Sequence, residues 1–256
     1  MSTQMIPTQS TMMEEMIMLT KFGFYGASCY DWLLYSAKVL KNCGMDVILI
    51  DMSENKSLSY AIPDIPGVKN QVIDYMGCSF ATSIPKDAED AYDTAFIYLG
   101  DTVNPSIHFD YTFCVTDCEL HSMKPRIQLW EKITALDYAP SQKMICSSES
   151  GADEIDPDEE FTTDCPHLII LGPMAESKYR YIAGQYSVDS KSCNAVDLDE
   201  GNMDCRISCQ YDTVVRFSKI SDSFKDLITK LCFTALGDTR DYKNFKKAFK
   251  KAERGK

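Results

Sequence analysis

The sequence lacks the segments that carry a chain into or across a membrane. No stretch approaches the ~18 consecutive apolar residues that a spanning helix needs. Residues 1–19 also lack a basic segment followed by a long apolar run, so we expect neither a signal peptide nor a transmembrane helix. Internal repeats and Gly/Ser-rich linkers are missing as well. A chain of 256 residues with 45% hydrophobic content is therefore expected to form a single large domain.

The cysteines do not have the spacing of a zinc or iron–sulfur site, which usually contains a C-x2-C pair. No such pair occurs among the eleven cysteines, and the three histidines are isolated from one another. Two C-x3-C pairs, Cys114/Cys118 and Cys205/Cys209, leave metal binding as the alternative. We expect no metal site, and instead buried or incidental thiols in a reducing cytosol. The other cysteines are Cys29, Cys43, Cys78, Cys146, Cys165, Cys193 and Cys232, and the histidines are His108, His121 and His167.

Strand and helix patterns alternate along the chain. Periodic apolar positions predict helices at residues 30–42, at 123–136 and from about Ser221 to 237, and Gly44 is placed to end the first of them. This alternation is typical of a doubly wound, mostly parallel sheet, so the expected fold class is α/β. Apolar stretches predict the strands at residues 17–25, 47–50, 91–100, 109–117, 142–148 and 166–173.

Charge is segregated along the chain. Residues 149–160 carry seven acidic side chains, which predict a solvated loop, with partner contact as the alternative. Residues 238–256 contain eight lysines or arginines and three acidic residues, a net charge of +5 that leaves −17 on the rest of a chain of net charge −12. We therefore expect a flexible extension at 1–16, a domain at 17–237 that includes the acidic loop, and a basic tail at 238–256.

The turn FYGASCYD, residues 24–31, connects the first predicted strand to the first predicted helix. Beyond that helix, the strand VILID ends on Asp51. A glycine-containing turn between strand and helix, followed by a buried strand with a terminal acid, is the layout of a phosphate-binding unit. The turn contains no lysine, so the layout is present without the cation that usually holds a phosphate.

These segments resemble the deviant Walker P-loop ATPases of the MinD/ParA family. When the helix, Gly44 and VILID are matched, FYGASCYD falls on the family's K-G-G-x-G-K-[ST]-[ST] loop. YDTAFIYLG is similar to its Walker B strand, DYTFCVTDCELHSMKPRIQLWEKI to its next strand, turn and helix, and RFSKISDSFKDLITKL to its closing helix. The resemblance covers most of residues 18–237 and implies a P-loop NTPase-like fold.

In that register most of the residues that handle ATP in the family are replaced. Only Gly26 of the loop and the strand-ending Asp51 keep their family identity. Because phosphoryl transfer depends on lysine, Mg²⁺ and backbone amides, we expect a degenerate ATPase with no cofactor, and ATP binding is the alternative. The family's lysines, two glycines, hydroxyls and Walker B aspartate are replaced by Phe24, Cys29, Tyr25, Ser28, Tyr30, Asp31 and Tyr98. A bound nucleotide would contact Gly26, Ala27, Ser28, Cys29, Tyr30, Asp31 and Asp51.

The resemblance implies a non-hydrolysing localisation or assembly factor that acts by protein binding, as degenerate members do in pilus, secretion or polar-organisation systems. A homodimer is one such partnership, in which Phe24, Tyr25, Tyr30 and Trp32 either form an apolar contact face or belong to the core. One alternative is a divergent ATPase that uses Asp51 and Asp101. Another is a ParA-like DNA partition protein, which a body of charge −17 disfavours. The sequence contains no Ser/His/Asp or Cys/His constellation.

The basic tail predicts an amphipathic docking helix. Tyr242, Phe245, Phe249 and Ala252 share one helical face, and lysines occupy the remainder. MinD-like proteins often end in such a helix, so we expect a cytoplasmic protein that is peripheral at the inner membrane face or bound to an acidic partner. A solvated terminus and a nucleic-acid contact are the alternatives. The basic positions are Lys243, Lys246, Lys247, Lys250, Lys251 and Arg254.

Overall fold

A computed structural model describes residues 19–58, 72–75, 77–136, 160–163, 165–173, 176–186, 188, 192–211, 215–237 and 241–255. Three predictions lie outside these residues: the N-terminal extension at 1–16, the strand at 142–148, and the acidic loop except for Glu160.

One sheet of eight strands forms the centre of the domain, in the order β3-β4-β2-β5-β1-β6-β7-β8. Every pairing is parallel except that of β3 with β4. The prediction of a doubly wound, mostly parallel α/β domain is confirmed. The strands are β1 (Thr20–Gly26), β2 (Val47–Asp51), β3 (Ile73–Tyr75), β4 (Cys78–Ala81), β5 (Thr94–Gly100), β6 (Tyr111–Asp117), β7 (His167–Leu171) and β8 (Cys193–Val196).

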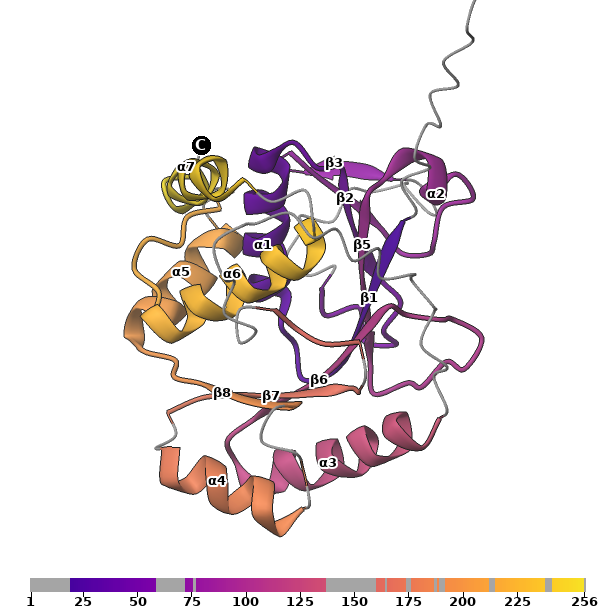
Figure 1. The fold of residues 1–256 in the computed structure, drawn as a ribbon, viewed down its shortest axis with the longest axis vertical. Coiled ribbons are helices and arrows are strands. Elements are labelled where there is room, and N and C mark those ends of the chain that lie inside the picture. The colour runs from indigo at the N-terminus through magenta and orange to yellow at the C-terminus, as the bar shows by residue number, and fades with distance from the viewer. Residues whose placement is uncertain are drawn as a thin grey trace, which may run out of the picture.

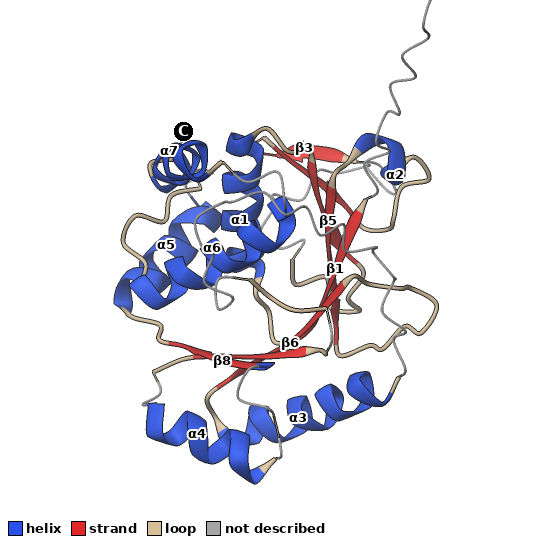
Figure 2. Cartoon of the chain, viewed as in Figure 1, coloured by secondary structure: helices blue, strands red, loops and turns tan. Residues whose placement is uncertain are grey.

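Helices cover both faces of the sheet (Figures 1 and 2). One face carries α1 (Tyr30–Cys43), α5 (Glu200–Tyr211), α6 (Asp222–Leu236) and α7 (Tyr242–Glu253). The opposite face carries α3 (Leu120–Ala135) and α4 (Glu176–Gln185), and the short α2 (Ala88–Ala91) precedes β5. Each layer of helices buries its own apolar core against the sheet, since the central strands are apolar on both sides. No helix among the described residues is long and apolar enough to cross a membrane.

The first helix begins and ends where the sequence predicts. Gly44 follows α1 in the left-handed conformation, with φ of 98°, and its amide donates to the carbonyls of Leu40 and Lys41. Nothing lies within 4 Å of the position that a Cβ would take at Gly44, so glycine is needed there for its backbone conformation alone. The chain then reaches β2 after two further residues.

Aromatic side chains fill the core between the sheet and α1. The ring of Phe24 lies 4.9 Å from that of Phe113 and 5.3 Å from that of Trp32. Tyr25, the next residue of β1, is buried on the opposite face of the sheet, and Tyr30 is 4% exposed. Of the two roles predicted for Phe24, Tyr25, Tyr30 and Trp32, the structure therefore supports the core and not an exposed apolar contact face.

The C-terminal helix packs its apolar side against the domain. Phe245 is 5% exposed, and its ring lies 4.6 Å from that of Phe233 on α6. The ring of Phe249 meets that of Phe217 at 5.6 Å, edge to face. The amide of Phe217 also donates to the carbonyl of Glu253 in the last turn of α7. Residues 242–253 are therefore packed as part of the domain, in contrast to the expected separate tail.

This packing corrects the expected exposure of the tail's apolar face. Of Tyr242, Phe245 and Phe249, only Tyr242 is largely exposed, at 56%. Lys246, Lys247 and Lys250 lie on the outer side of α7, so the surface of this helix is basic and contains little apolar area. The sequence pattern predicted which side of the helix is apolar. It did not predict that the domain itself covers that side.

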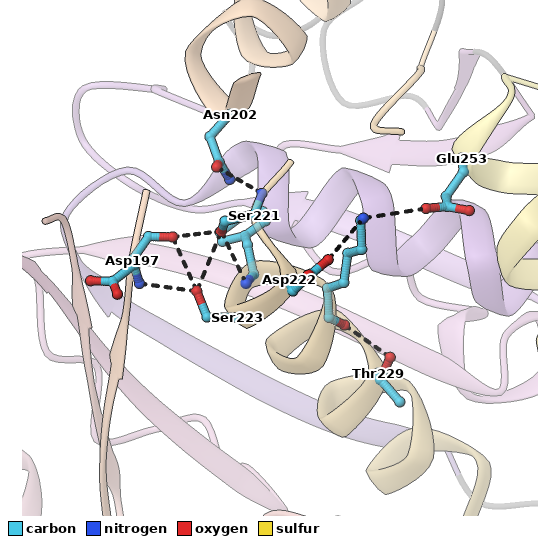
Figure 3. A network of polar contacts seen from close by, with 9 residues as sticks. Asp197, Asn202, Ser221, Asp222, Ser223, Thr229 and Glu253 are labelled. Carbon is cyan, nitrogen blue, oxygen red and sulfur yellow. Dashed lines mark hydrogen bonds and ion pairs between the residues drawn. The ribbon is translucent and has the colours of Figure 1, made fainter. Parts of the chain in front are cut away.

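Polar contacts fix the start of α6 to the end of β8 (Figure 3). Ser221 caps α6 by accepting a hydrogen bond from the amide of Phe224, and its hydroxyl donates to the carbonyl of Asp197. Ser223 accepts a hydrogen bond from the amide of Asp197. Farther along α6, Lys225 contacts Asp222 and Glu253. β8 is an edge strand, and these side chains satisfy backbone groups at its end that would otherwise be open to pairing.

Candidate functional site

The strand β1 continues through the position where the resemblance places a phosphate-binding loop. Phe24, Tyr25 and Gly26 all pair with β6, and Phe24 and Tyr25 also pair with β5. Their side chains lie in the cores on the two faces of the sheet, so the backbone here is held as strand from both sides. Only Ala27, Ser28 and Cys29 remain between β1 and α1.

Backbone groups of this short turn are bonded to neighbouring strands. The amide of Ala27 donates to the carbonyl of Val115 at 2.7 Å, and the hydroxyl of Tyr98 donates to the carbonyl of Gly26 at 2.9 Å. Gly26 has φ of 90°, and a Cβ there would lie 2.2 Å from the Val115 carbonyl oxygen. The preserved glycine thus allows β1 and β6 to approach closely, and the amide of Ala27 points at protein instead of at a ligand.

The start of α1 holds an internal carboxylate. Asp31 is 4% exposed, and its Oδ1 atom has no hydrogen-bond partner. Burial raises the pKa of Asp31, and the positive charge of Arg206 and the backbone amides of Trp32 and Asp31 partly offset this increase. The Asp31 side chain itself therefore occupies the helix N-terminus, where an anionic ligand would otherwise bind.

Arg206, on α5, lies beside this carboxylate. Its guanidinium is 4.6 Å from the centre of the Tyr30 ring, and its Nη2 donates to the carbonyl of Ser28 at 3.4 Å. The Tyr30 hydroxyl in turn donates to the carbonyl of Arg206. The first turn of α1 is thereby linked to α5 through residues 176 positions apart in sequence. Cys29 is buried, which raises the pKa of its thiol, so it has no thiolate character.

The two carboxylates of the predicted ATPase alternative are both engaged. Asp51 is 2% exposed, and its Oδ1 accepts hydrogen bonds from the amide and the hydroxyl of Ser53. Asp101 forms an ion pair with Arg126 of α3. Asp51 is thus buried, whereas Asp101 is 63% exposed and is engaged through its pairing with Arg126. Tyr98, which the resemblance places at the Walker B position, has its pKa raised to about 12 by burial.

A polar depression of about 170 Å³ adjoins the turn at the carboxyl ends of β1, β2 and β5. Parallel sheets usually bind ligands at such ends. Its walls include Gly26, Ser28 and Ser53, together with the Asp101–Arg126 pair. Of the predicted contacts of a nucleotide, Gly26 and Ser28 line this depression and Ala27 is half-buried, whereas Cys29, Tyr30, Asp31 and Asp51 are buried. The structure thus brings the predicted residues together without a loop that encircles a phosphate.

Two arginines of this region were missed by sequence reasoning. Arg206 and Arg126 belong to helices that follow different strands, and the resemblance assigns them no role. A basic residue within a helix carries no local signal that it will face a turn elsewhere in the chain. Within the described parts of the chain, no three His, Cys, Asp or Glu side chains are arranged so that they could hold a metal ion.

No family model matches the chain, and no curated protein matches its sequence. Among solved structures, the fold is similar to a ParA family ATPase from Chlorobium tepidum TLS, with a TM-score of 0.49 and 12% identity over 85% of this chain and 98% of that chain. It is also similar to a chain of the MinC:MinD cell division protein complex of Aquifex aeolicus, with a TM-score of 0.47 and 8% identity over 82% and 94% of the two chains. Identities this low describe a similarity of fold alone.

Proposed function

We propose that this protein is a degenerate, non-hydrolysing member of the MinD/ParA group that works as a localisation or assembly factor by binding protein partners. The observation that carries the proposal is the continuation of β1 through Gly26, which leaves three residues before α1. A phosphate-binding loop needs backbone amides that point at the ligand. Here the amide of Ala27 is bonded to β6.

The charges at the turn also offer little attraction to a nucleotide. A lysine contact to phosphate is worth roughly 1.5–3 kcal/mol, and Cys29 cannot supply it. The Asp31 side chain occupies the helix start with Arg206 beside it, and Asp101 is paired with Arg126, so both arginines near the turn already face an acid. We therefore expect no cofactor, and we assign the domain a binding role.

A membrane or nucleic-acid role would depend on the outer face of α7, which presents lysines. With Phe245 buried, attraction to an anionic surface would come from lysines, at about 1 kcal/mol each near a lipid headgroup layer. Such binding is weak and is lost as salt is added. A peripheral location at the inner membrane face would accordingly be secondary to protein contacts, and duplex DNA would be repelled by the acidic remainder of the chain.

A titration with fluorescent ATP tests the proposal. We expect no saturable signal below about 1 mM, with or without Mg²⁺, and no phosphate release. Asp51→Asn and Asp101→Asn serve as matched variants, because the alternative ATPase would depend on both carboxylates. If the protein binds ATP in a metal-dependent way and hydrolyses it, and Asp51→Asn abolishes the hydrolysis, this proposal is wrong and the protein is the divergent ATPase.

A further inference from the structure

The outer side of α5 carries a line of exposed apolar side chains. Met203, Ile207 and Tyr211 are 56%, 48% and 79% exposed. Their spacing of four residues places them on one ridge of the helix, about 12 Å from end to end. The opposite side of α5 packs into the domain through buried Cys205 and Cys209, so the ridge faces away from the core.

This ridge differs from the other exposed apolar residues of the described chain. Leu120 on α3 and Tyr181 on α4 are 66% and 70% exposed, but each is a single side chain on its helix. Scattered apolar residues are normal on a protein surface, whereas a contiguous group marks an interaction site. α5 also lies at the outer edge of its helical layer, beside α6 and α7, where a partner can approach (Figure 1).

The charge around the ridge favours a basic partner. Glu200 and Asp204 are exposed on the same helix, and Asp204 adjoins Met203. The single cation of α5, Arg206, is directed to the Tyr30 ring and the turn before α1. On α5 itself the ridge is therefore bordered by two acids, Glu200 and Asp204, whereas the exposed Lys219 packs against the helix farther round, at Gly201 and Cys205. The chain as a whole has a net charge of −12.

We propose that this ridge, Met203–Ile207–Tyr211, binds an amphipathic helix of another protein that has apolar residues four apart and lysines or arginines beside them. The i, i+4 ridges of two helices interlock, so a partner with the same spacing fits this surface. Basic flanks would pair with Glu200 and Asp204. A second copy is a poorer occupant, because two acidic chains repel each other. This inference rests on the proposed protein-binding function and gives it a surface.

The test uses the full chain and a labelled synthetic peptide of about 18 residues with leucines four apart and lysines elsewhere. Fluorescence anisotropy at physiological salt measures the affinity. The double variant Met203→Ser/Ile207→Ser should weaken binding about tenfold or more, since central apolar anchors dominate such contacts. The matched control, Leu120→Ser/Tyr181→Ser, removes equally exposed apolar residues elsewhere and should change the affinity less than about twofold.

Three results would overturn the inference. One is an affinity that both double variants reduce equally or leave unchanged. Another is equal binding of a peptide in which glutamates replace the lysines. The third is a dimer of the wild-type chain in sedimentation that the Met203→Ser/Ile207→Ser variant abolishes, because the ridge would then join two copies. ATP turnover would instead contradict the proposed function and leave the peptide result in place.

Discussion

Replacing Phe245 by alanine tests whether α7 is part of the folded domain. The Phe245 side chain is 5% exposed and contacts the rings of Phe233 at 4.6 Å and Phe249 at 5.8 Å. Phe→Ala substitutions in cores cost about 3–5 kcal/mol, because burial is lost and a cavity remains. Domains are stable by about 5–15 kcal/mol, so the variant should still fold.

Tyr242→Ala is the matched control on the same helix. Tyr242 is 56% exposed, and Lys246 lies 4.4 Å above its ring, so we expect a loss below about 1 kcal/mol. Urea unfolding followed by circular dichroism measures both variants. Phe245→Ala should shift the midpoint by about 1–2 M, and Tyr242→Ala by much less. Equal, small shifts of the two urea midpoints would refute the packing of α7. The apolar face of α7 would then be exposed to solvent or available to a membrane.

Other substitutions test the turn, the core and the α6 cap. Gly26→Ala should lower the melting temperature far more than Gly44→Ala, because both glycines have positive φ but only Gly26 faces a carbonyl at 2.2 Å; similar losses would contradict the close approach. Burial lowers the pKa of His167 to about 4, below the 6.5 of the unfolded chain. Stability should therefore fall by roughly 3 kcal/mol as the pH drops from 7 to 4, and His167→Phe should lack this component when unfolding is measured at both pH values. Ser221→Ala should cost about 1–2 kcal/mol in the same assay, and no change would argue against the cap.

The sequence predicted the elements with long apolar patterns. β1, α1, β2, β5, β6 and α6 lie where the apolar runs and the helix-ending Gly44 place them, and Ser221 caps α6. In these segments local pattern and tertiary burial agree, because both faces of a central parallel strand are covered.

Short and polar elements were missed. β8 has four residues, and β3 has three. α5 carries Cys205 and Cys209 on its buried side and Met203 and Ile207 on its exposed side, so its sequence shows no single apolar face. The position of such elements is decided by the sheet and the helices around them, which local sequence does not specify.

The candidate site was predictable in its residues but not in its conformation. The absence of lysine in FYGASCYD indicated lost phosphate chemistry, yet nothing local showed that Phe24 and Tyr25 continue β1. These two residues form a strand, where the resemblance places a loop, because they pair with β5 and β6, which lie far along the chain. Arg206 reaches the turn only because α5 folds against α1.

Hydrogen–deuterium exchange at residues 22–31, with and without millimolar ATP and Mg²⁺, distinguishes a paired strand from a nucleotide-binding loop. Because β1 is paired on both sides through Phe24 and Tyr25, the amides of residues 22–25 should exchange slowly, as in a central strand. ATP should leave every rate in this segment unchanged. Rapid exchange at residues 24–26 that becomes slow only when ATP is added would reveal a nucleotide-binding loop and contradict the continuation of β1 through Gly26.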